Sequence, residues 1–364
     1  MAPRLTRCEM AVIGLSIVCY GLLVAYVHVT GFNVVTSDFM MYYRWSNAWW
    51  NFSLRTPSHV PLYSILLWAF RSLTFHLLDA ATVMHAVALP FVAGAYFYVH
   101  RILRFHFPAA RNVGFAVFGL YPFVGYCFAF APADPLAIFF LVAAAYYSLE
   151  RKWRCFALCL AAGLISHKAT WPFIALLAAD ALWRKKCPLF WPLLAGLPLL
   201  AFWGWGLYEE HDALWILRDN IKSEFTAIST LPIMDGLLGP LLHPTAMAKL
   251  VRTCVLLALV LVTVSLFAWN LCRLRQPDAL FNIALLLPII LLAVLLNQYE
   301  VWAVLRFGRV IAIPLAAFLV EKERIRRFLE RPAWFYGVAV TFLITNFFYA
   351  YYFMWMYFQD SAGA

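Results

Sequence analysis

The sequence predicts an all-α polytopic membrane protein with about eleven transmembrane helices. Three observations predict this fold class. Apolar residues make up 65% of the 364 residues and charged residues only 13%, whereas soluble domains carry about 25% charged residues. Apolar runs recur at lengths that suit the bilayer, which needs roughly 20 residues for each helical crossing. Clusters of Lys and Arg separate these runs, as in loops at a membrane surface. A water-soluble globule is therefore excluded.

The first predicted span, 10–29, follows Arg4 and Arg7 and is long enough to cross the bilayer. No small-residue cleavage pattern follows it, so we expect a retained anchor and not a removed signal peptide. The segment 59–77 is expected to lie in the membrane interface without crossing. The remaining spans are expected at 82–100, 112–131, 135–149, 154–167, 170–183, 188–208, 251–272, 279–297, 303–320 and 333–357.

The basic residues predict the orientation of the chain. If the N-terminus is cytoplasmic, the basic clusters between spans fall on the cytoplasmic side, as the positive-inside rule requires. These clusters are Arg4 and Arg7; Arg101, Arg104 and Arg111; Arg151, Lys152 and Arg154; Arg184 to Lys186; Arg273 and Arg275; and Lys322 to Arg331. A full crossing at 61–77 would invert every later loop. We therefore expect one integral-membrane domain over 1–364, with outer loops at about 30–81 and 209–250.

The net charge of +10 does not indicate a nucleic-acid partner, because no RNA- or DNA-binding motif accompanies the basic clusters. Membrane lipids, whose headgroups attract basic loops, are the expected partners of these clusters. The eight cysteines are scattered and show no metal-binding spacing, so we predict neither a disulfide framework nor a zinc site. No internal repeat indicates two inverted halves, which argues against a secondary transporter.

The first outer loop contains a candidate catalytic residue. The stretch 36–50 begins with an N-cap pattern and continues as a helix that carries Asp38, Tyr42, Trp45 and Trp49 on one face. A carboxylate beside apolar surroundings is a stronger base, because desolvation penalises its charged form. Asp38 could thus take a proton from an acceptor hydroxyl. The alternative is that Asp38 only caps a helix whose aromatic residues form an interfacial belt.

Two further segments extend this pattern. The first loop continues through Pro57, His59, Pro61 and Tyr63 into an apolar helix, and the stretch 131–140 opens a later span with Asp134. Together with the preceding span, this arrangement resembles the GT-C superfamily of polyprenyl-phosphate-sugar-dependent glycosyltransferases, including its mannosyltransferase-like members. These motifs cover only a small part of the chain, whereas the topology covers most of it.

The resemblance implies a fold with juxtamembrane helices in the first outer loop and an inverting transfer in which Asp38 is the general base or a positioning group. Asp134 would correspond to the second acidic site of that superfamily. It would orient the acceptor or the donor together with Tyr42, His59 and Tyr63. The alternative for Asp134 is a helix N-cap that complements the macrodipole.

Basic residues predicted on the outer face are candidates for binding the donor phosphate. His167 and Lys168 lie between two short spans, and Arg306 and Arg309 lie at the start of another. The Arg-x-x-Arg spacing places both guanidinium groups on one helical face, which suits a phosphate clamp, and the resemblance implies that Arg306 binds the leaving group. We assign His167 to binding and not to proton donation. The alternatives are snorkelling arginines and ordinary turn residues.

The expected activity is transfer of one sugar, a hexose such as mannose, from a polyprenyl-phosphate carrier to an extracytoplasmic hydroxyl. The sequence shows no soluble domain after the last span, so a glycolipid or glycan acceptor is expected. No cofactor is assigned. A divalent metal stays an open alternative because the resembled superfamily has metal-dependent and metal-independent members, although the consecutive acids of 208–215 cannot all face one ion. The alternatives are a lipid or glycolipid flippase, a glycan polymerase, and an acyltransferase, for which His85 is the clearest mid-helix candidate.

Overall fold

The computed structural model describes residues 5–30, 38–52, 60–122, 125, 129, 133–215, 247–295 and 306–362. These residues form helices, 3₁₀ turns and connecting loops, with no strand among them. Four of the described helices are long and apolar enough to cross a membrane. They lie in α1 (Arg7–Thr30), α4 (Ala80–His106), α10 (Phe190–Glu210) and α13 (Met247–Leu271). The coarse prediction of an all-helical membrane protein is therefore supported.

Most of the other described helices also lie where spans or interfacial elements are predicted, whereas α17 (Glu323–Leu329) lies within the predicted basic loop 322–331. These other helices are α2 (Asp38–Trp45), α3 (Leu62–Leu73), α5 (Arg111–Gly119), α7 (Ala133–Leu149), α8 (Trp153–Leu164), α9 (Trp171–Trp183), α14 (Ala279–Leu295), α16 (Ala312–Glu321), α17 and α18 (Pro332–Ala362). Several are short: α8 has 12 residues and α9 has 13, which is about 18–20 Å of helix against a hydrocarbon core of about 30 Å. The count of about eleven spans stays a prediction.

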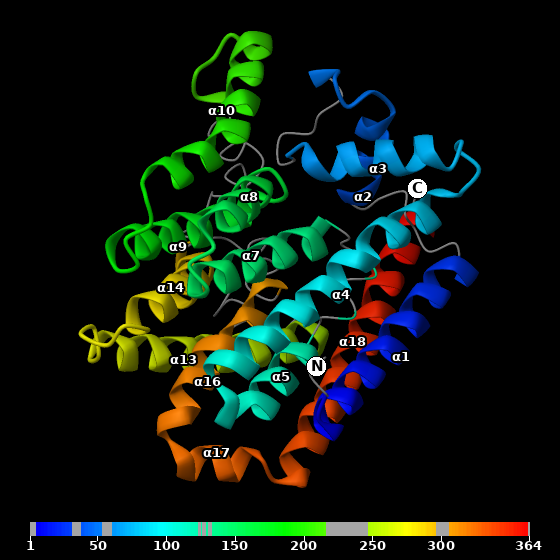
Figure 1. Cartoon of the computed structure of the whole chain (residues 1–364). Coiled ribbons are helices and arrows are strands. Elements are labelled where there is room, and N and C mark those ends of the chain that lie inside the picture. The colour runs from blue at the N-terminus through cyan, green and yellow to red at the C-terminus, as the bar shows by residue number, and fades with distance from the viewer. Residues whose placement is uncertain are drawn as a thin grey trace.

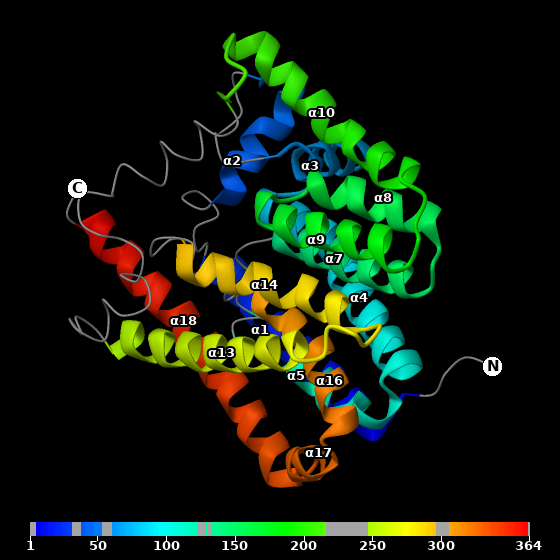
Figure 2. The same cartoon turned by 90° about the vertical axis from the view of Figure 1, so that its left-hand side faces the viewer.

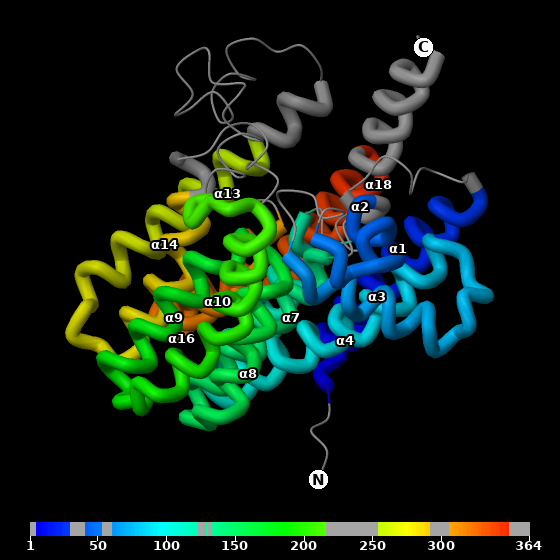
Figure 3. Tube along the Cα trace, turned by 90° about the horizontal axis from the view of Figure 1, so that it is seen from above, coloured from blue at the N-terminus to red at the C-terminus, as the bar shows by residue number. Residues whose placement is uncertain are grey.

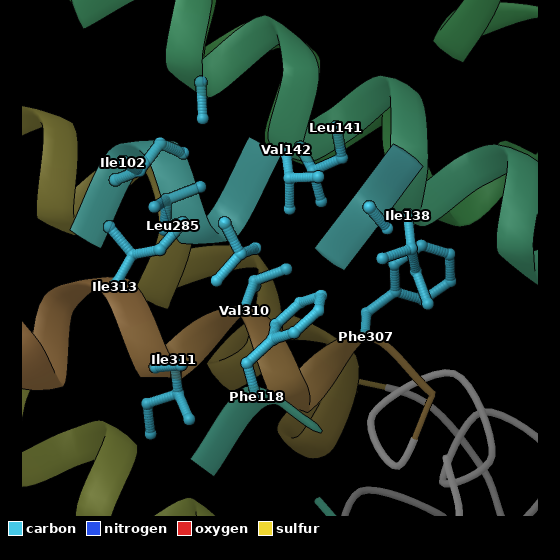
Figure 4. Packing of buried hydrophobic residues seen from close by; sticks show 14 of the residues in the cluster. Ile102, Phe118, Ile138, Leu141, Val142, Leu285, Phe307, Val310, Ile311 and Ile313 are labelled. Atoms are coloured by element: carbon cyan, nitrogen blue, oxygen red, sulfur yellow. The ribbon is translucent and has the colours of Figure 1, made fainter. Parts of the chain in front are cut away.

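The largest core lies between α1, α4, α5, α7, α14 and α16, and its close packing is seen in Figure 4. Fully buried aliphatic residues such as Ile138, Leu285 and Ile313 come from segments far apart in the sequence and meet there. A smaller cluster attaches α2 and α3 to the starts of α4 and α7 through Tyr42, Tyr63, Val83, Ala133 and Leu136. The helices of the first loop thus pack directly on the start of α7.

Polar contacts join the basic loops to one another. His106 Nε2 lies 3.5 Å from Glu150 Oε1, and Lys185 Nζ donates to Ser148 Oγ at 2.9 Å. The remaining contacts are those of Arg184 with the carbonyl oxygens of Leu274 and Gln276, of Arg273 with Glu321, and of Arg111 with Glu9. The loops predicted to share the cytoplasmic side therefore gather at one end of the molecule, here called the basic end.

The opposite end carries the first-loop helices. In Figure 1, α2 and α3 lie far from α17, and Figure 2 shows the same separation after a quarter turn. Figure 3 shows α10 and α3 on different sides of the molecule when it is seen from above. The backbone N–H of Leu62, at the start of α3, donates to the carbonyl oxygen of Ile165 at 3.0 Å, which connects this end to the turn after α8.

Asp79 caps the start of α4 and gives a first prediction. Its carboxylate accepts from Thr82 N at 3.0 Å and from Thr82 Oγ1 at 2.6 Å. Asp79→Ala is expected to lower the free energy of unfolding by about 1 kcal/mol at pH 7, measured by thermal unfolding in detergent. The Thr82 side-chain hydrogen bond lowers the pKa of Asp79.

The sign of that pKa shift sets the pH dependence. Because the folded-state pKa is lowered, the ionised cap contributes stability above the unfolded pKa, and this contribution is lost as the pH falls through the folded pKa. The difference between Asp79→Ala and the unchanged protein should therefore shrink in acid. Asp79→Asn is the control, since Asn caps helices as well as Asp does. An equal loss in both variants would contradict the assignment.

Candidate functional site

The candidate site is centred on Asp134, in the first turn of α7. An acid in this position interacts favourably with the helix macrodipole. The carboxylate is nevertheless almost inaccessible, with 1% exposure, and its Oδ2 lies 3.3 Å from Arg306 Nε. Its other oxygen, Oδ1, lies 3.7 Å from His167 Nε2. Asp134 thus contacts side chains from two distant segments. A residue that only capped the start of α7 would not require these contacts.

His167 is held in one orientation by the turn that contains it. Its backbone is extended, with φ −162° and ψ 134°, and it precedes the 3₁₀ turn Lys168–Thr170. The backbone N–H of Ala169 donates to His167 Nδ1 at 3.1 Å. Nδ1 is therefore the unprotonated nitrogen, and the proton of the neutral ring is on Nε2, which faces Asp134. This arrangement is compatible with the assignment of His167 to binding.

The chain around His167 is fixed by hydrogen bonds to the last turn of α8. Ser166 Oγ and Thr170 Oγ1 both donate to the carbonyl oxygen of Gly163, at 2.9 and 2.8 Å. Trp171 Nε1 donates to the carbonyl oxygen of Leu164 at 2.8 Å. These bonds satisfy carbonyl groups that the end of a helix leaves without intrahelical partners. They end α8 early and hold His167 and Lys168, whose side chains are partly exposed, beside α7.

Tyr42 and Tyr63 belong to the cluster of buried residues at the start of α7, the helix that carries Asp134. Their rings meet edge to face with centroids 5.2 Å apart, and Ser64 Oγ donates to the carbonyl oxygen of Tyr42 at 3.1 Å. Both tyrosines are buried in the cluster that includes Ala133. The structure therefore brings Tyr42 and Tyr63 to the start of α7 and gives both rings a packing role there, and their role in orienting the acceptor or the donor stays a prediction.

Asp38 is the first residue of α2, so the predicted helix start is confirmed. Its side chain lies outside the described part of the chain, and so does His59. The predicted face of the helix is confirmed for Tyr42 and Trp45, which are 4% and 1% exposed. The catalytic role of Asp38 stays a prediction.

Arg309 differs from its predicted arrangement. The guanidinium group lies 3.7 Å from the centroid of the Phe118 ring and 5.4 Å from that of Tyr96, and the residue is fully buried. Arg306 instead faces Asp134 and is 20% exposed. The two arginines therefore do not face one phosphate together in this structure. Spacing determines which helical face an arginine lies on, whereas the aromatic rings packed against that face decide where its planar guanidinium group stacks.

Sequence reasoning missed two features of the structure. Phe307 is fully buried and packs between His167 and Phe173, with ring centroids 5.7 and 5.9 Å away. Glu9 is also fully buried, and it contacts His100 Nδ1 at 3.1 Å and the Arg111 guanidinium group. An acid at the edge of an apolar run is the signal that could have revealed Glu9, because acids that become buried there are costly unless paired. Nothing in the sequence marks Phe307.

The acid-rich stretch at the end of α10 is an exposed helix end. His211 adopts the left-handed conformation with φ 53°, and Asp212 Oδ1 accepts from Leu214 N at 2.8 Å. Glu209 and Glu210 are exposed. Among the residues that the structure describes, no group of three or more His, Cys, Asp or Glu could hold a metal ion.

Comparison of the chain with protein-family models, with curated proteins and with solved structures finds no match.

Proposed function

We propose that the chain is an integral-membrane glycosyltransferase of the GT-C type. It transfers one sugar, a hexose such as mannose, from a polyprenyl-phosphate carrier to an extracytoplasmic hydroxyl of a glycolipid or glycan, with inversion. The observation that carries the proposal is the contact of Asp134 with both Arg306 and His167. Three residues selected from the sequence for sugar-phosphate chemistry come from distant segments and meet at one point.

The charges at this point suit a leaving phosphate. Arg306 is positive, Asp134 is negative and the His167 ring is neutral. Lys168, the residue after His167, adds a positive charge to the adjoining turn, so the three charged groups sum to +1. Fixed positive charge placed where a phosphate leaves stabilises the developing anion. In the proposed step, Asp38 takes the acceptor's hydroxyl proton, the acceptor oxygen bonds to C1 of the sugar, and the bond from C1 to the phosphate oxygen breaks. The phosphate leaves with that electron pair, beside Arg306.

The proposed topology has about eleven spans, a cytoplasmic N-terminus and an extracytoplasmic site. It is supported by the contacts that gather the basic loops at one end, because basic loops are enriched on the cytoplasmic side. The candidate site belongs to the other end of α7, where α2 and α3 pack. A glycosylation or cysteine-labelling scan of the loops would test this orientation. Accessible labels at 184–186 from outside the cell would contradict it.

The test of the function is transfer by the purified protein in liposomes, with a labelled polyprenyl-phosphate hexose as the donor. Arg306→Lys is expected to raise the KM for the donor about tenfold, since it keeps the charge but removes the forked hydrogen bonds of the guanidinium group. Arg44→Lys is the matched control, because Arg44 is an exposed arginine of α2. An unchanged donor KM in Arg306→Lys, with only a lower yield of folded protein, would exclude the phosphate-binding role.

The second candidate function is a lipid or glycolipid flippase. One observation favours it: the buried Arg309 guanidinium group lies near Tyr96, at the middle of α4, so a charged group lies at mid-depth and not only at one end. Ionisable groups at this depth can mark a transport pathway. A fluorescent glycolipid that changes leaflet in proteoliposomes, without any transfer of sugar, would favour the flippase over the transferase.

A further inference from the structure

A second polar site lies at the basic end, far from Asp134. A cavity of about 430 Å³ is lined there by side chains that include Leu149, Arg151, Arg184, Lys185 and Asp278. Leu149 is the last residue of α7 and Asp134 is in its first turn, so the two sites are separated by about 22 Å along the helix. The cavity plays no part in the proposed transfer.

Three inter-helix loops form this cavity and are joined by hydrogen bonds. Lys185 Nζ donates to Ser148 Oγ at 2.9 Å, which connects the loop after α9 to the end of α7. The two terminal nitrogens of Arg184 donate to the carbonyl oxygens of Leu274 and Gln276, in the loop after α13. Arg151 adopts the left-handed conformation, with φ 56°. These bonds hold the Lys185 and Arg184 side chains in place and join the three loops.

The basic groups of the cavity differ in what they can offer to a ligand. Lys185 Nζ lies 2.8 Å from Asp180 Oδ2 and 4.5 Å from the centroid of the Phe281 ring, so most of its charge is compensated. Burial lowers the pKa of Lys185, and the adjacent Asp180 opposes this shift. The terminal nitrogens of Arg184 already donate to carbonyl groups. Arg184 therefore attracts an anionic ligand mainly through its charge. Arg151 lines the cavity with an exposed side chain.

Asp278 is an acid that lines the cavity together with these cations. Asp278 is partly buried and its Oδ2 lies 3.4 Å from Asn282 Nδ2. With Arg151, Arg184 and Lys185 positive and Asp180 and Asp278 negative, these five groups sum to +1. A carboxylate repels a phosphate but accepts hydrogen bonds from hydroxyl groups. The mixture of arginine and carboxylate therefore suits a ligand that carries both a phosphate and free hydroxyls.

We propose that this cavity binds the phosphate ester of a polyol, with the phosphate hydrogen-bonded to Arg151 and attracted by the charge of Arg184, and with a hydroxyl on Asp278. Guanidinium groups bind phosphate through paired hydrogen bonds, and basic pockets between helices at a membrane surface bind anionic headgroups. The same chemistry is found in a phospholipid headgroup such as inositol or glycerol phosphate and in a soluble polyol phosphate. The site does not depend on the proposed transferase function.

The test uses the full-length protein purified in detergent and titrated with phosphatidylinositol, phosphatidylglycerol and phosphatidylcholine by native mass spectrometry. Glycerol 3-phosphate and inorganic phosphate are titrated separately by calorimetry. We expect phosphatidylinositol or phosphatidylglycerol to bind more tightly than phosphatidylcholine, and Arg151→Ala to weaken this binding about tenfold or more, as for a lost hydrogen bond to a charged group. Binding of the soluble esters with the same dependence on Arg151 identifies a soluble ligand, whereas binding of the lipids alone identifies a headgroup.

Lys152→Ala is the matched control, because Lys152 is the next residue, pairs with Glu150 at 3.8 Å and does not line the cavity. The affinity of Lys152→Ala for these lipids should stay within about twofold of that of the unchanged protein. Asp278→Ala, which removes both the charge and the acceptor, should bind inorganic phosphate more tightly and lose the preference for hydroxyl-bearing ligands. Equal weakening by Arg151→Ala and Lys152→Ala, or no probe binding better than phosphatidylcholine, would overturn the proposal.

Discussion

Replacing Asp38 with Asn is expected to reduce sugar transfer about a hundred- to ten-thousand-fold, which is the usual contribution of a general base. An amide cannot accept the acceptor's hydroxyl proton, whereas its size and its capacity to cap α2 are those of the carboxylate. The fold and donor binding should therefore change little. The measurement is initial transfer rate in proteoliposomes at saturating donor, together with the donor affinity and the unfolding midpoint of the same preparations.

Asp212→Asn provides the control for Asp38→Asn. Asp212 lies just beyond the end of α10 and its Oδ1 accepts from Leu214 N. Asn can accept the same bond, so this variant removes one acid with little structural change and should keep its transfer rate. If Asp38→Asn also keeps its rate, residue 38 is not the base. If both variants lose activity, the effect comes from the net charge of the outer face.

The second large effect is expected at the contact between Asp134 and Arg306. Arg306→Ala should lower the free energy of unfolding by about 3–5 kcal/mol, because it removes the cationic partner of a buried carboxylate. Asp134 is 1% exposed whereas the Arg306 side chain is 20% exposed. Asp134→Asn should therefore cost less, since the remaining guanidinium group can reach water more easily than the remaining carboxylate could.

The double variant Asp134→Asn/Arg306→Ala distinguishes this ion pair from two independent contacts. If the pair is coupled, the double variant should be more stable than the sum of the single losses predicts, with a coupling energy of about 0.5–3 kcal/mol. Denaturant unfolding in detergent micelles measures all four proteins. Losses that simply add would show that the 3.3 Å contact contributes nothing specific, and the arrangement proposed for the leaving phosphate would lose its structural support.

Much of the helical layout could be predicted because it depends on local patterns. Described helices lie at the positions of the predicted spans, and α2 begins at Asp38 as the N-cap pattern indicates. The lengths were less predictable. The span predicted at 154–167 ends as α8 at Leu164, because Ser166 and Thr170 hydrogen-bond to Gly163 and terminate the helix. Such side-chain bonds depend on the conformation of the turn and leave no trace in hydropathy.

Part of the candidate site could also be predicted from local sequence patterns. Ionisable residues in apolar sequence are costly, so Asp134, His167 and Arg306 could be selected one by one. Their meeting within 3.3 and 3.7 Å could not be derived, because it depends on how α7, the turn after α8 and the segment before α16 pack. Arg309 illustrates the difference, since its partner is Phe118 of another helix and not the ligand that its spacing suggested.

The sequence by itself determined that this chain is helical, that it is a membrane protein and which of its charged residues require an explanation. Composition and apolar run length decide these properties because transfer from water to lipid depends on each residue's own chemistry. Only the tertiary structure decided which charges pair, since ion pairs act over a few ångströms and therefore require side chains from distant segments to be held at fixed positions. Asp134 with Arg306, and Glu9 with Arg111, are such pairs.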